Sequence, residues 1–137
     1  MNLNYNKNVN KIMKVVCAVI IKNDNVLCCK RVKGKFKNYF EFPGGKVEIN
    51  EDNISALLRE VKEELGIDVK VRNLIDVISH SYEDIDVDLY FYRCELIDEE
   101  PQFIEYEVMK WLNILDLDSK LFLPGNKEII EKLKRNQ

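Results

Sequence analysis

The sequence is poor in several features that mark particular protein classes. No apolar run approaches the ~20 residues that a membrane-spanning helix needs. The N-terminal residues are polar and do not form a signal peptide. The net charge of −3 lacks the basic excess that non-specific binding to nucleic acid requires. We therefore expect neither a membrane nor a nucleic-acid polymer among the partners of this protein.

Paired cysteine motifs are also missing. The chain has four cysteines, none of them in a C-x-x-C pair, and Cys28 and Cys29 are adjacent in an expected strand. Neighbouring side chains of a strand point to opposite faces, so these two are not expected to act together. A chain of this length buries a core that is stable without disulfides. We expect buried, reduced thiols and a cytoplasmic protein.

What is present is the composition of an ordinary globular protein, with 46% apolar and 33% charged residues. The length of 137 residues suits one domain. Residues 1–12 are rich in Asn and Lys and show no periodicity, so we expect a flexible N-terminal tail followed by a single domain over residues 13–137. Met13, just before the first expected strand, is an alternative start to Met1.

Apolar periodicity predicts an α+β fold. Strands are expected at residues 15–21, 26–31, 39–42, 69–71, 74–79, 87–94 and 106–111, with a polar turn at 80–84. Helices are expected at residues 53–65, 115–117 and 126–135. Asn50 or Asn53 would cap the first helix, and Gly66 would end it. Strands before, between and after two main helices fit one mixed β-sheet sandwiched between helices.

The helix expected at residues 53–65 has two faces. Its apolar stripe consists of Ile54, Leu57, Leu58, Val61 and Leu65. Glu60, Glu63 and Glu64 stand at i, i+3 and i+4, so their carboxylates gather on a neighbouring face. Like charges at this spacing repel one another, whereas Mg²⁺ would bind their oxygens. An acidic helix face taken alone is more commonly solvated surface.

The spacing around this helix is more specific than the acidic face alone. From Gly45 to Ile67 the chain matches every fixed position of Gly-x5-Glu-x7-Arg-Glu-U-x-Glu-Glu-x-Gly-U, where U is aliphatic. In this motif the chain resembles the Nudix hydrolases, which cleave nucleoside diphosphates linked to another moiety. The resemblance implies the Nudix fold, an α/β/α sandwich with a mixed sheet.

The resemblance also implies a metal centre that binds Mg²⁺, with Mn²⁺ as an alternative. The expected ligands and catalytic acids are Glu60, Glu63 and Glu64, with the backbone carbonyl of Gly44 as a further ligand. The family counterpart of Arg59 forms ion pairs that hold the acids in place, and Glu51 would either pair with Arg59 or bind metal.

The general base differs between branches of the family. Some members use a helix glutamate, and others use a glutamate far downstream. Glu105 stands six residues before Trp111, as a glutamate does in the MutT branch, and is an expected base and metal ligand; Glu107 is its rival. The single histidine, His80, lies at the end of an expected strand and is expected to be structural.

Segments outside the motif resemble the MutT and CTP-pyrophosphohydrolase branch. These are YFEFPGGK at residues 39–46, and Trp111 with LPGN at residues 123–126. The residues that face the nucleobase in MutT-like enzymes match Arg31, Phe42 and Asn126. A planar aromatic ring, a guanidinium and an amide can together recognise a purine edge. Lys46, after the glycine turn, completes the expected substrate-binding set.

These residues predict a Mg²⁺-dependent nucleoside triphosphate pyrophosphohydrolase that releases a nucleoside monophosphate and pyrophosphate. Removal of 8-oxo-dGTP from the nucleotide pool is the first expectation, and hydrolysis of CTP, dCTP or 5-methyl-dCTP is the alternative. A non-catalytic nucleotide-binding sensor is the alternative from a different class, and the complete set of motif acids argues against it. The expected partner is the nucleoside triphosphate itself, and the protein would be a monomer or a homodimer.

Overall fold

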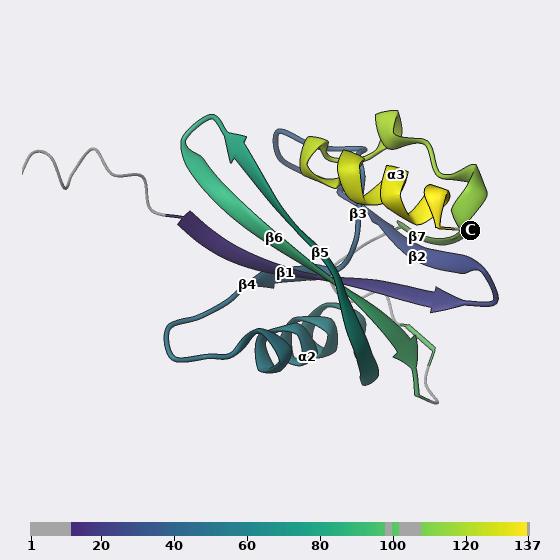
Figure 1. Ribbon diagram of the computed structural model, residues 1–137, viewed down its shortest axis with the longest axis horizontal. Helices are drawn as coiled ribbons and strands as arrows, with labels where there is room; N and C mark the ends of the chain where they lie inside the picture. The colour runs from purple at the N-terminus through teal and green to yellow at the C-terminus, as the bar shows by residue number, and fades with distance from the viewer. Residues whose placement is uncertain (1–11, 98–99, 102–107, 137) are drawn as a thin grey trace, which may run out of the picture.

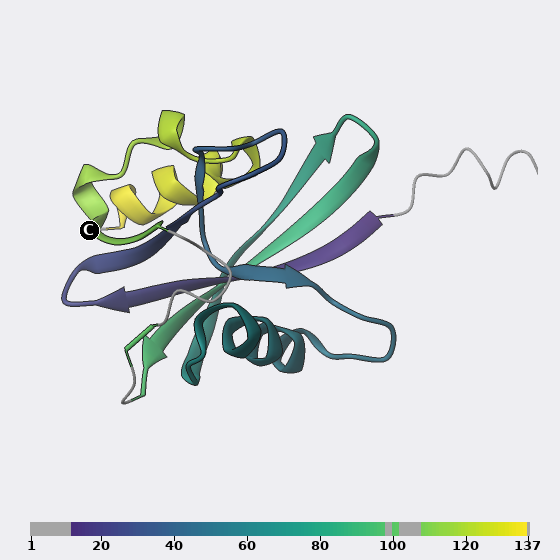
Figure 2. The ribbon, with the colours of Figure 1, turned by 180° about the vertical axis from the view of Figure 1, so that it is seen from behind.

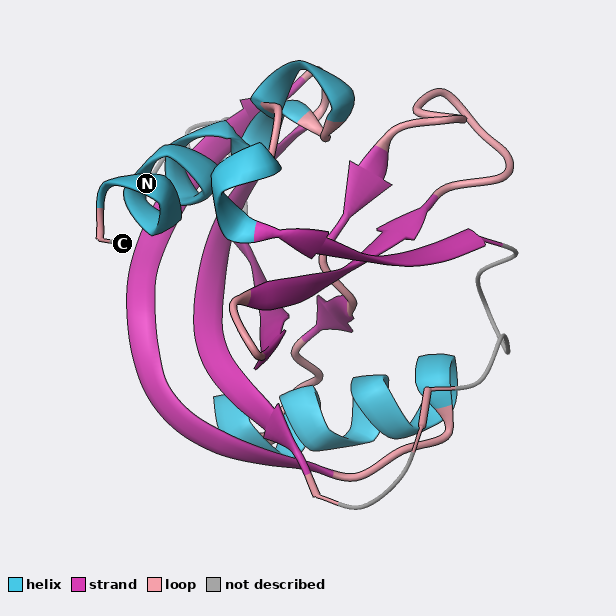
Figure 3. Ribbon diagram, turned by 90° about the vertical axis from the view of Figure 1, so that its right-hand side faces the viewer, coloured by secondary structure: helices cyan, strands magenta, loops and turns pink. Residues whose placement is uncertain are grey.

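A mixed β-sheet lies between two helical layers in the computed structural model, which describes residues 12–97, 100–101 and 108–136 (Figure 1). The strands are β1 (Ile12–Lys22), β2 (Asn25–Lys30), β3 (Phe40–Glu41), β4 (Gly44–Lys46), β5 (Val69–Tyr82), β6 (Ile85–Leu96) and β7 (Val108–Asn113). Helix α2 (Asn53–Leu65) covers one face of the sheet. The other face is covered by α3 (Lys127–Arg135) and the short 3-10 helices η1 (Ile114–Asp116), η2 (Ser119–Leu121) and η3 (Pro124–Asn126), as Figure 3 shows. The predicted α+β class and layer order are confirmed.

Strand β1 joins the parts of the sheet, and Figure 2 shows it running through the centre of the molecule. It pairs in parallel with β6 and antiparallel with β4, and its last residues pair with β2. Cys17 and Val19 point toward the α3 layer, whereas Val16, Ala18 and Ile20 point toward α2. Because both faces of β1 are buried at residues 16–20, its sequence there is continuously apolar instead of alternating.

The predicted state of the cysteines is confirmed. All four are buried and none is in a disulfide. Cys28 packs in the α3-side core and Cys29 in the α2-side core, on opposite faces of β2 as expected. Burial raises the pKa of the Cys28 and Cys94 thiols to about 12, so both remain protonated and unreactive at neutral pH.

Helix α2 has the predicted bounds, but the prediction of its N-cap was wrong. Asp52 caps the helix, because its carboxylate accepts a hydrogen bond from the backbone N–H of Ser55 at 2.7 Å. Asn50 has a φ of 66° and belongs to the preceding turn, while Asn53 lies inside the helix. Gly66 ends the helix as predicted, with a left-handed φ of 68°.

The buried stripe of α2 is narrower than predicted and shifted. It consists of Ala56, Leu57, Val61 and Leu65. Ile54 and Leu58 are 40% and 39% exposed, because they lie at the edge of the face that meets the sheet. The i, i+4, i+8 series of leucine and valine is therefore the part of the pattern that contacts β1.

The prediction of two separate strands after α2 was also wrong. Residues 69–82 form one long strand, β5, which pairs antiparallel with β6 along its length. The register shifts between Val71 and Asn73 and again between Leu74 and Asp76. Such bulges bend a strand without ending it, so the polar residues there do not mark a turn. The turn is confined to residues 83–84 instead of 80–84.

The last helix closes the α3-side core. Ile129, Ile130 and Leu133 of α3 are buried, as predicted. The helix begins at Lys127, one residue later than expected, because residues 124–126 form the 3-10 helix η3. In the described part of the chain no helix has the length and apolarity needed to span a membrane.

The packing of α2 predicts different effects for two adjacent leucines. Leu57→Ala should lower the free energy of unfolding by about 2–5 kcal/mol, because it leaves a cavity between α2 and the sheet. Leu58→Ala removes the same atoms from a partly exposed position and should cost less than about 1 kcal/mol. Urea denaturation of both variants measures the difference. Equal losses would contradict the burial of Leu57 against the sheet.

Candidate active site

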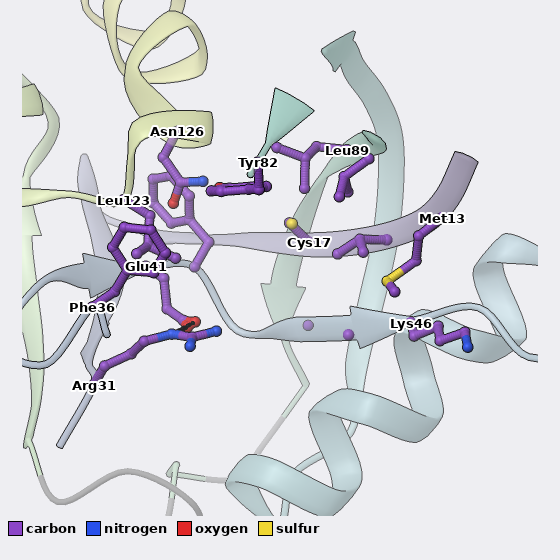
Figure 4. A pocket seen from close by; sticks show the side chains of 15 residues that line it. Met13, Cys17, Arg31, Phe36, Glu41, Lys46, Tyr82, Leu89, Leu123 and Asn126 are labelled. Atoms are coloured by element: carbon purple, nitrogen blue, oxygen red, sulfur yellow. Dashed lines mark hydrogen bonds and ion pairs between the residues drawn. The ribbon is translucent and has the colours of Figure 1, made fainter. Parts of the chain in front are cut away.

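A cavity of about 330 Å³ opens on the α3 side of β1 (Figure 4). All four residues predicted to bind substrate line it: Arg31, Phe42, Lys46 and Asn126. The predicted ligand Gly44 lines it as well. Side chains that lie up to 95 positions apart in the sequence therefore meet in one place. In Figure 4, Arg31 lies at one end of the cavity and Lys46 at the other.

The inner wall of the cavity is apolar. Met13, Val15 and Cys17 alternate along β1 and project into it, and Val87 and Leu89 join them from the neighbouring strand β6. Strand alternation explains why these odd-numbered residues of β1 share one face. A flat apolar wall of this kind suits the ring of a nucleobase, whose faces are poorly solvated.

Asn126 presents an unsatisfied acceptor at the cavity. The residue is 4% exposed, and its Oδ1 has no hydrogen-bond partner among the described residues. A buried acceptor without a donor costs about 1–3 kcal/mol. A bound molecule with an N–H group could donate a hydrogen bond to this oxygen, so the Asn126 amide can recognise such a group in a ligand.

Arg31 forms an ion pair with a buried acid. Its Nε donates to both oxygens of Glu41, at 3.0 and 2.8 Å, and both residues line the cavity. Burial raises the pKa of Glu41, and the Arg31 guanidinium opposes this effect. The pair places fixed charges of both signs at the end of the cavity opposite Lys46.

Phe42 contributes to the wall from within the core. It is 3% exposed, and its ring packs on Phe122 with centroids 5.5 Å apart and edge-on to Phe91 at 6.2 Å. These contacts hold the ring in a single orientation. Phe42 therefore shapes the cavity wall instead of projecting into the cavity as an exposed platform.

The glycine turn lies directly against the acidic face of α2. The backbone N–H of Gly44 donates to Glu64 Oε1 at 2.8 Å. A Cβ atom at Gly45 would lie 2.4 Å from the carboxyl carbon of Glu60, and one at Gly44 would lie 1.9 Å from the carbonyl oxygen of Val16. A side chain at Gly44 would collide with the backbone of β1, and one at Gly45 would displace the Glu60 carboxylate, so the two glycines are what allows backbone and carboxylates to approach so closely.

Arg59 holds the acids of the motif together. Its Nε and Nη2 donate to the two oxygens of Glu51 at 2.8 and 2.9 Å, and its Nη1 donates to Glu60 at 2.9 Å and to Glu63 at 3.4 Å. Glu51 thus forms an ion pair with Arg59. This is one of the two arrangements expected for Glu51. The hydrogen bond from Arg59 is the main reason that the pKa of Glu51 falls to about 2. A further bond from Nη2 to the carbonyl of Lys46 ties α2 to the glycine turn.

The donor set of this region suits a hard divalent cation. Glu60 and Glu64 are partly buried beside the glycine turn, and Glu63 is more exposed. Burial raises the pKa of Glu60, and Arg59 opposes this effect. Carboxylate oxygens are the ligands that Mg²⁺ and Mn²⁺ prefer. Within the described residues no three such groups lie close enough together to form a metal site by themselves.

Some predicted residues lie elsewhere. Glu105 and its rival Glu107 fall outside the described residues. The ring of His80 packs against Tyr82 with centroids 4.5 Å apart, and His80 does not line the cavity. Its position therefore offers no role in binding substrate.

Among the aromatic and charged residues that line the cavity, three were missed by the sequence reasoning: Phe36, Glu41 and Tyr82. Phe36 is an aromatic residue within a lysine-rich loop, and Glu41 is a charge enclosed by aromatic residues. An aromatic residue among lysines and a charge between aromatic residues both depart from the local pattern, and each could have indicated a site residue. Tyr82 was assigned to a turn and carried no signal of its own.

Known proteins match this chain over both the acidic helix and the cavity. The NUDIX domain profile matches residues 11–133. The 8-oxo-dGTP diphosphatase of Escherichia coli K12 is 32% identical over 123 residues, which cover 88% of this chain and 95% of that protein.

Two solved structures share the fold. A MutT protein of the Nudix hydrolase family from methicillin-resistant Staphylococcus aureus 252 superposes with a TM-score of 0.76 at 32% identity, covering 94% of this chain and 100% of that one. A MutT Nudix hydrolase from Burkholderia pseudomallei superposes with a TM-score of 0.81 at 25% identity, covering 88% and 97%. The predicted fold is thereby confirmed.

The close approach at Gly45 predicts an effect on metal binding. Gly45→Ala should displace the Glu60 carboxylate and lower the affinity for Mn²⁺ by about 10- to 100-fold, as the loss of support for a metal ligand does. Titration followed by electron paramagnetic resonance measures the affinity. Gly34, in the loop between β2 and β3, has a φ of 87°, so Gly34→Ala strains the backbone although its Cβ would meet no atom within 4 Å. It is the control for the strain of a glycine substitution and should bind Mn²⁺ normally. Normal binding by Gly45→Ala would remove Glu60 from the metal site.

Proposed function

The chain belongs to the Nudix family, and from this premise we propose that it is a divalent-cation-dependent nucleoside triphosphate pyrophosphohydrolase that acts on 8-oxo-dGTP. The products are 8-oxo-dGMP and pyrophosphate. The observation that carries the proposal is the shape of one cavity. At one end lies the buried Oδ1 of Asn126, which has no hydrogen-bond donor among the described residues. At the other end the glycine turn lies against the motif acids.

The phosphate end of the cavity has the groups that pyrophosphate hydrolysis needs. Glu60, Glu63 and Glu64 would hold the cation, and the exposed ammonium of Lys46 offsets phosphate charge at the cavity edge. When bound, the cation supplies Lewis-acid polarisation and lowers the pKa of the attacking water. Arg59 keeps the carboxylates oriented through its bonds to Glu51 and Glu60. The water proton passes to a carboxylate, either a helix acid or Glu105.

The nucleobase end explains a preference for an oxidised purine. In its diketo form 8-oxoguanine carries a hydrogen on N7, whereas N7 of guanine is an acceptor. The unsatisfied Oδ1 of Asn126 can accept that N–H, but it would face a lone pair on unmodified guanine. An unpaired buried acceptor is costly, so this contrast gives discrimination and not only affinity. The Arg31–Glu41 pair supplies further donors and acceptors at the same end.

A pyrophosphate-release screen tests the proposed function. The purified chain would be given 8-oxo-dGTP, dGTP, CTP, dCTP and 5-methyl-dCTP with Mg²⁺, with Mn²⁺, and after treatment with a chelator. We expect 8-oxo-dGTP to have the highest kcat/KM and the chelator to abolish release. The highest kcat/KM for a cytosine nucleotide would replace the proposed substrate. Nucleotide binding without pyrophosphate release would favour the sensor alternative.

Glu64→Gln should lower kcat by at least about a hundredfold, because it removes the charge of an expected metal ligand. The fold should remain intact, since the glutamine carbonyl can still accept the Gly44 N–H. The control is Glu128→Gln, the same change at an exposed acid of α3, which should keep wild-type kcat. A near-normal rate for Glu64→Gln would show that the metal assignment is wrong.

Asn126→Ala should reduce discrimination more than maximal rate. The ratio of kcat/KM for 8-oxo-dGTP over dGTP should fall by roughly three- to tenfold, the value of one hydrogen bond, while kcat stays within about twofold. Steady-state kinetics with both nucleotides measures the ratio. Asn136→Ala, at the exposed end of α3, serves as the control. An unchanged ratio would remove Asn126 from the nucleobase site.

A further inference from the structure

Tyr82 stands at the mouth of the cavity and contacts two of its walls. It is the last residue of β5, and its side chain is partly buried and lines the cavity. Its hydroxyl oxygen lies against the backbone of Gly125, so close that a Cβ atom on Gly125 would collide with it. Burial raises the pKa of Tyr82, so the hydroxyl stays protonated at neutral pH. Tyr82 therefore joins the β5–β6 hairpin to the η3 turn.

The contact requires glycine at position 125. A Cβ atom there would lie 2.7 Å from the Tyr82 hydroxyl oxygen and 2.7 Å from Cδ1 of Leu89. Any other residue would push the hydroxyl away from the backbone. Tyr82 and Gly125 are therefore suited to this one close contact.

The residue after Gly125 is Asn126, and the contact with the Tyr82 hydroxyl supports the backbone just before it. The backbone N–H of Asn126 donates to the carbonyl of Leu123 at 2.9 Å, which closes the η3 turn from the other side. In Figure 4 the side chains of Asn126 and Tyr82 lie next to each other at the cavity. The direction in which the unsatisfied Oδ1 points thus depends on a turn held at two places.

The ring of Tyr82 also supports the opposite wall. Phe36, on the loop between β2 and β3, packs edge-on against it with centroids 5.9 Å apart and lines the same cavity. Lys35 and Glu83 form an ion pair at 3.0 Å between the same two segments, but both side chains are well exposed. An exposed pair contributes little, so the aromatic contact is the one that places Phe36.

We propose that Tyr82 is a positioning residue for nucleobase selection, whose hydroxyl orients the Asn126 amide and whose ring places Phe36 over the nucleobase. The proposal rests on the proposed function, because it concerns the nucleobase end of the same cavity. Tyr82 lies at the end of the cavity that binds the nucleobase, away from the acids of α2. Its loss should therefore weaken selective binding and leave the chemical step unchanged.

The first test removes only the hydroxyl. Tyr82→Phe should raise the Kd for 8-oxo-dGMP about three- to tenfold and lower the preference over dGMP by a similar factor, as measured by calorimetry with Mg²⁺ present. The kcat for 8-oxo-dGTP should remain within about twofold. Tyr90→Phe is the matched control, because Tyr90 lies on β6 at the opposite face of the sheet, against the α2-side core. It should leave both Kd values unchanged.

A double-mutant cycle separates positioning from general support of the fold. In an Asn126→Ala background Tyr82→Phe should change the Kd for 8-oxo-dGMP by less than about twofold, because the amide that it orients is gone. A residue with a merely structural role would weaken binding equally in both backgrounds. Wild-type selectivity in Tyr82→Phe, or fully additive effects in the cycle, would overturn the proposal.

The binding assay does not depend on hydrolysis, so the two proposals can fail separately. A wild-type chain that binds 8-oxo-dGMP selectively but releases no pyrophosphate from any nucleotide would overturn the proposed function alone. A wild-type chain that hydrolyses 8-oxo-dGTP while Tyr82→Phe keeps wild-type selectivity would overturn the positioning role alone. A wild-type chain that binds none of the nucleotides would overturn both.

Discussion

The close approach between the glycine turn and helix α2 is the constraint on which the rest of the site depends. Gly44 and Gly45 pair with β1 on one side and meet Glu64 and Glu60 on the other. A side chain at either glycine would collide with the backbone of β1 or with a carboxylate. The helix can rest at this distance because its buried stripe packs on the α2-facing side of β1, so the geometry of the acids follows from core packing.

This approach gathers carboxylates whose mutual repulsion has to be offset. Arg59 provides the offset within the protein, since its guanidinium bonds to Glu51, Glu60 and Glu63 at once. Its planar group can reach several oxygens with directed bonds, which a lysine could not do. The acids still carry more negative charge than Arg59 neutralises, and a divalent cation, with twice the charge of one guanidinium, would neutralise it. Arg59 is in this sense a structural counterion for the acids.

The proposed nucleobase end is built differently, from single contacts between distant segments. Arg31, just after β2, bonds to Glu41 of β3, and the Tyr82 hydroxyl reaches Gly125 from the end of β5. No helix periodicity links these residues, so their relative positions depend on the long, bent β5–β6 hairpin and on the η3 turn.

Local patterns in the sequence were enough to determine the bounds of α2 and the buried strand at the centre of the sheet, because helices and strands repeat every 3.6 and 2 residues. They also determined the spacing of the glycines and acids, because that spacing is a short fixed interval along the chain. They misplaced the helix cap and divided β5, because an N-cap and a bulge depend on individual hydrogen bonds that a periodic pattern does not record. Only the tertiary structure decided that Phe36, Glu41 and Tyr82 join Asn126 around one cavity. Their partners come from separate strands and turns, and which of them meet is settled by the packing of the whole sheet against α3.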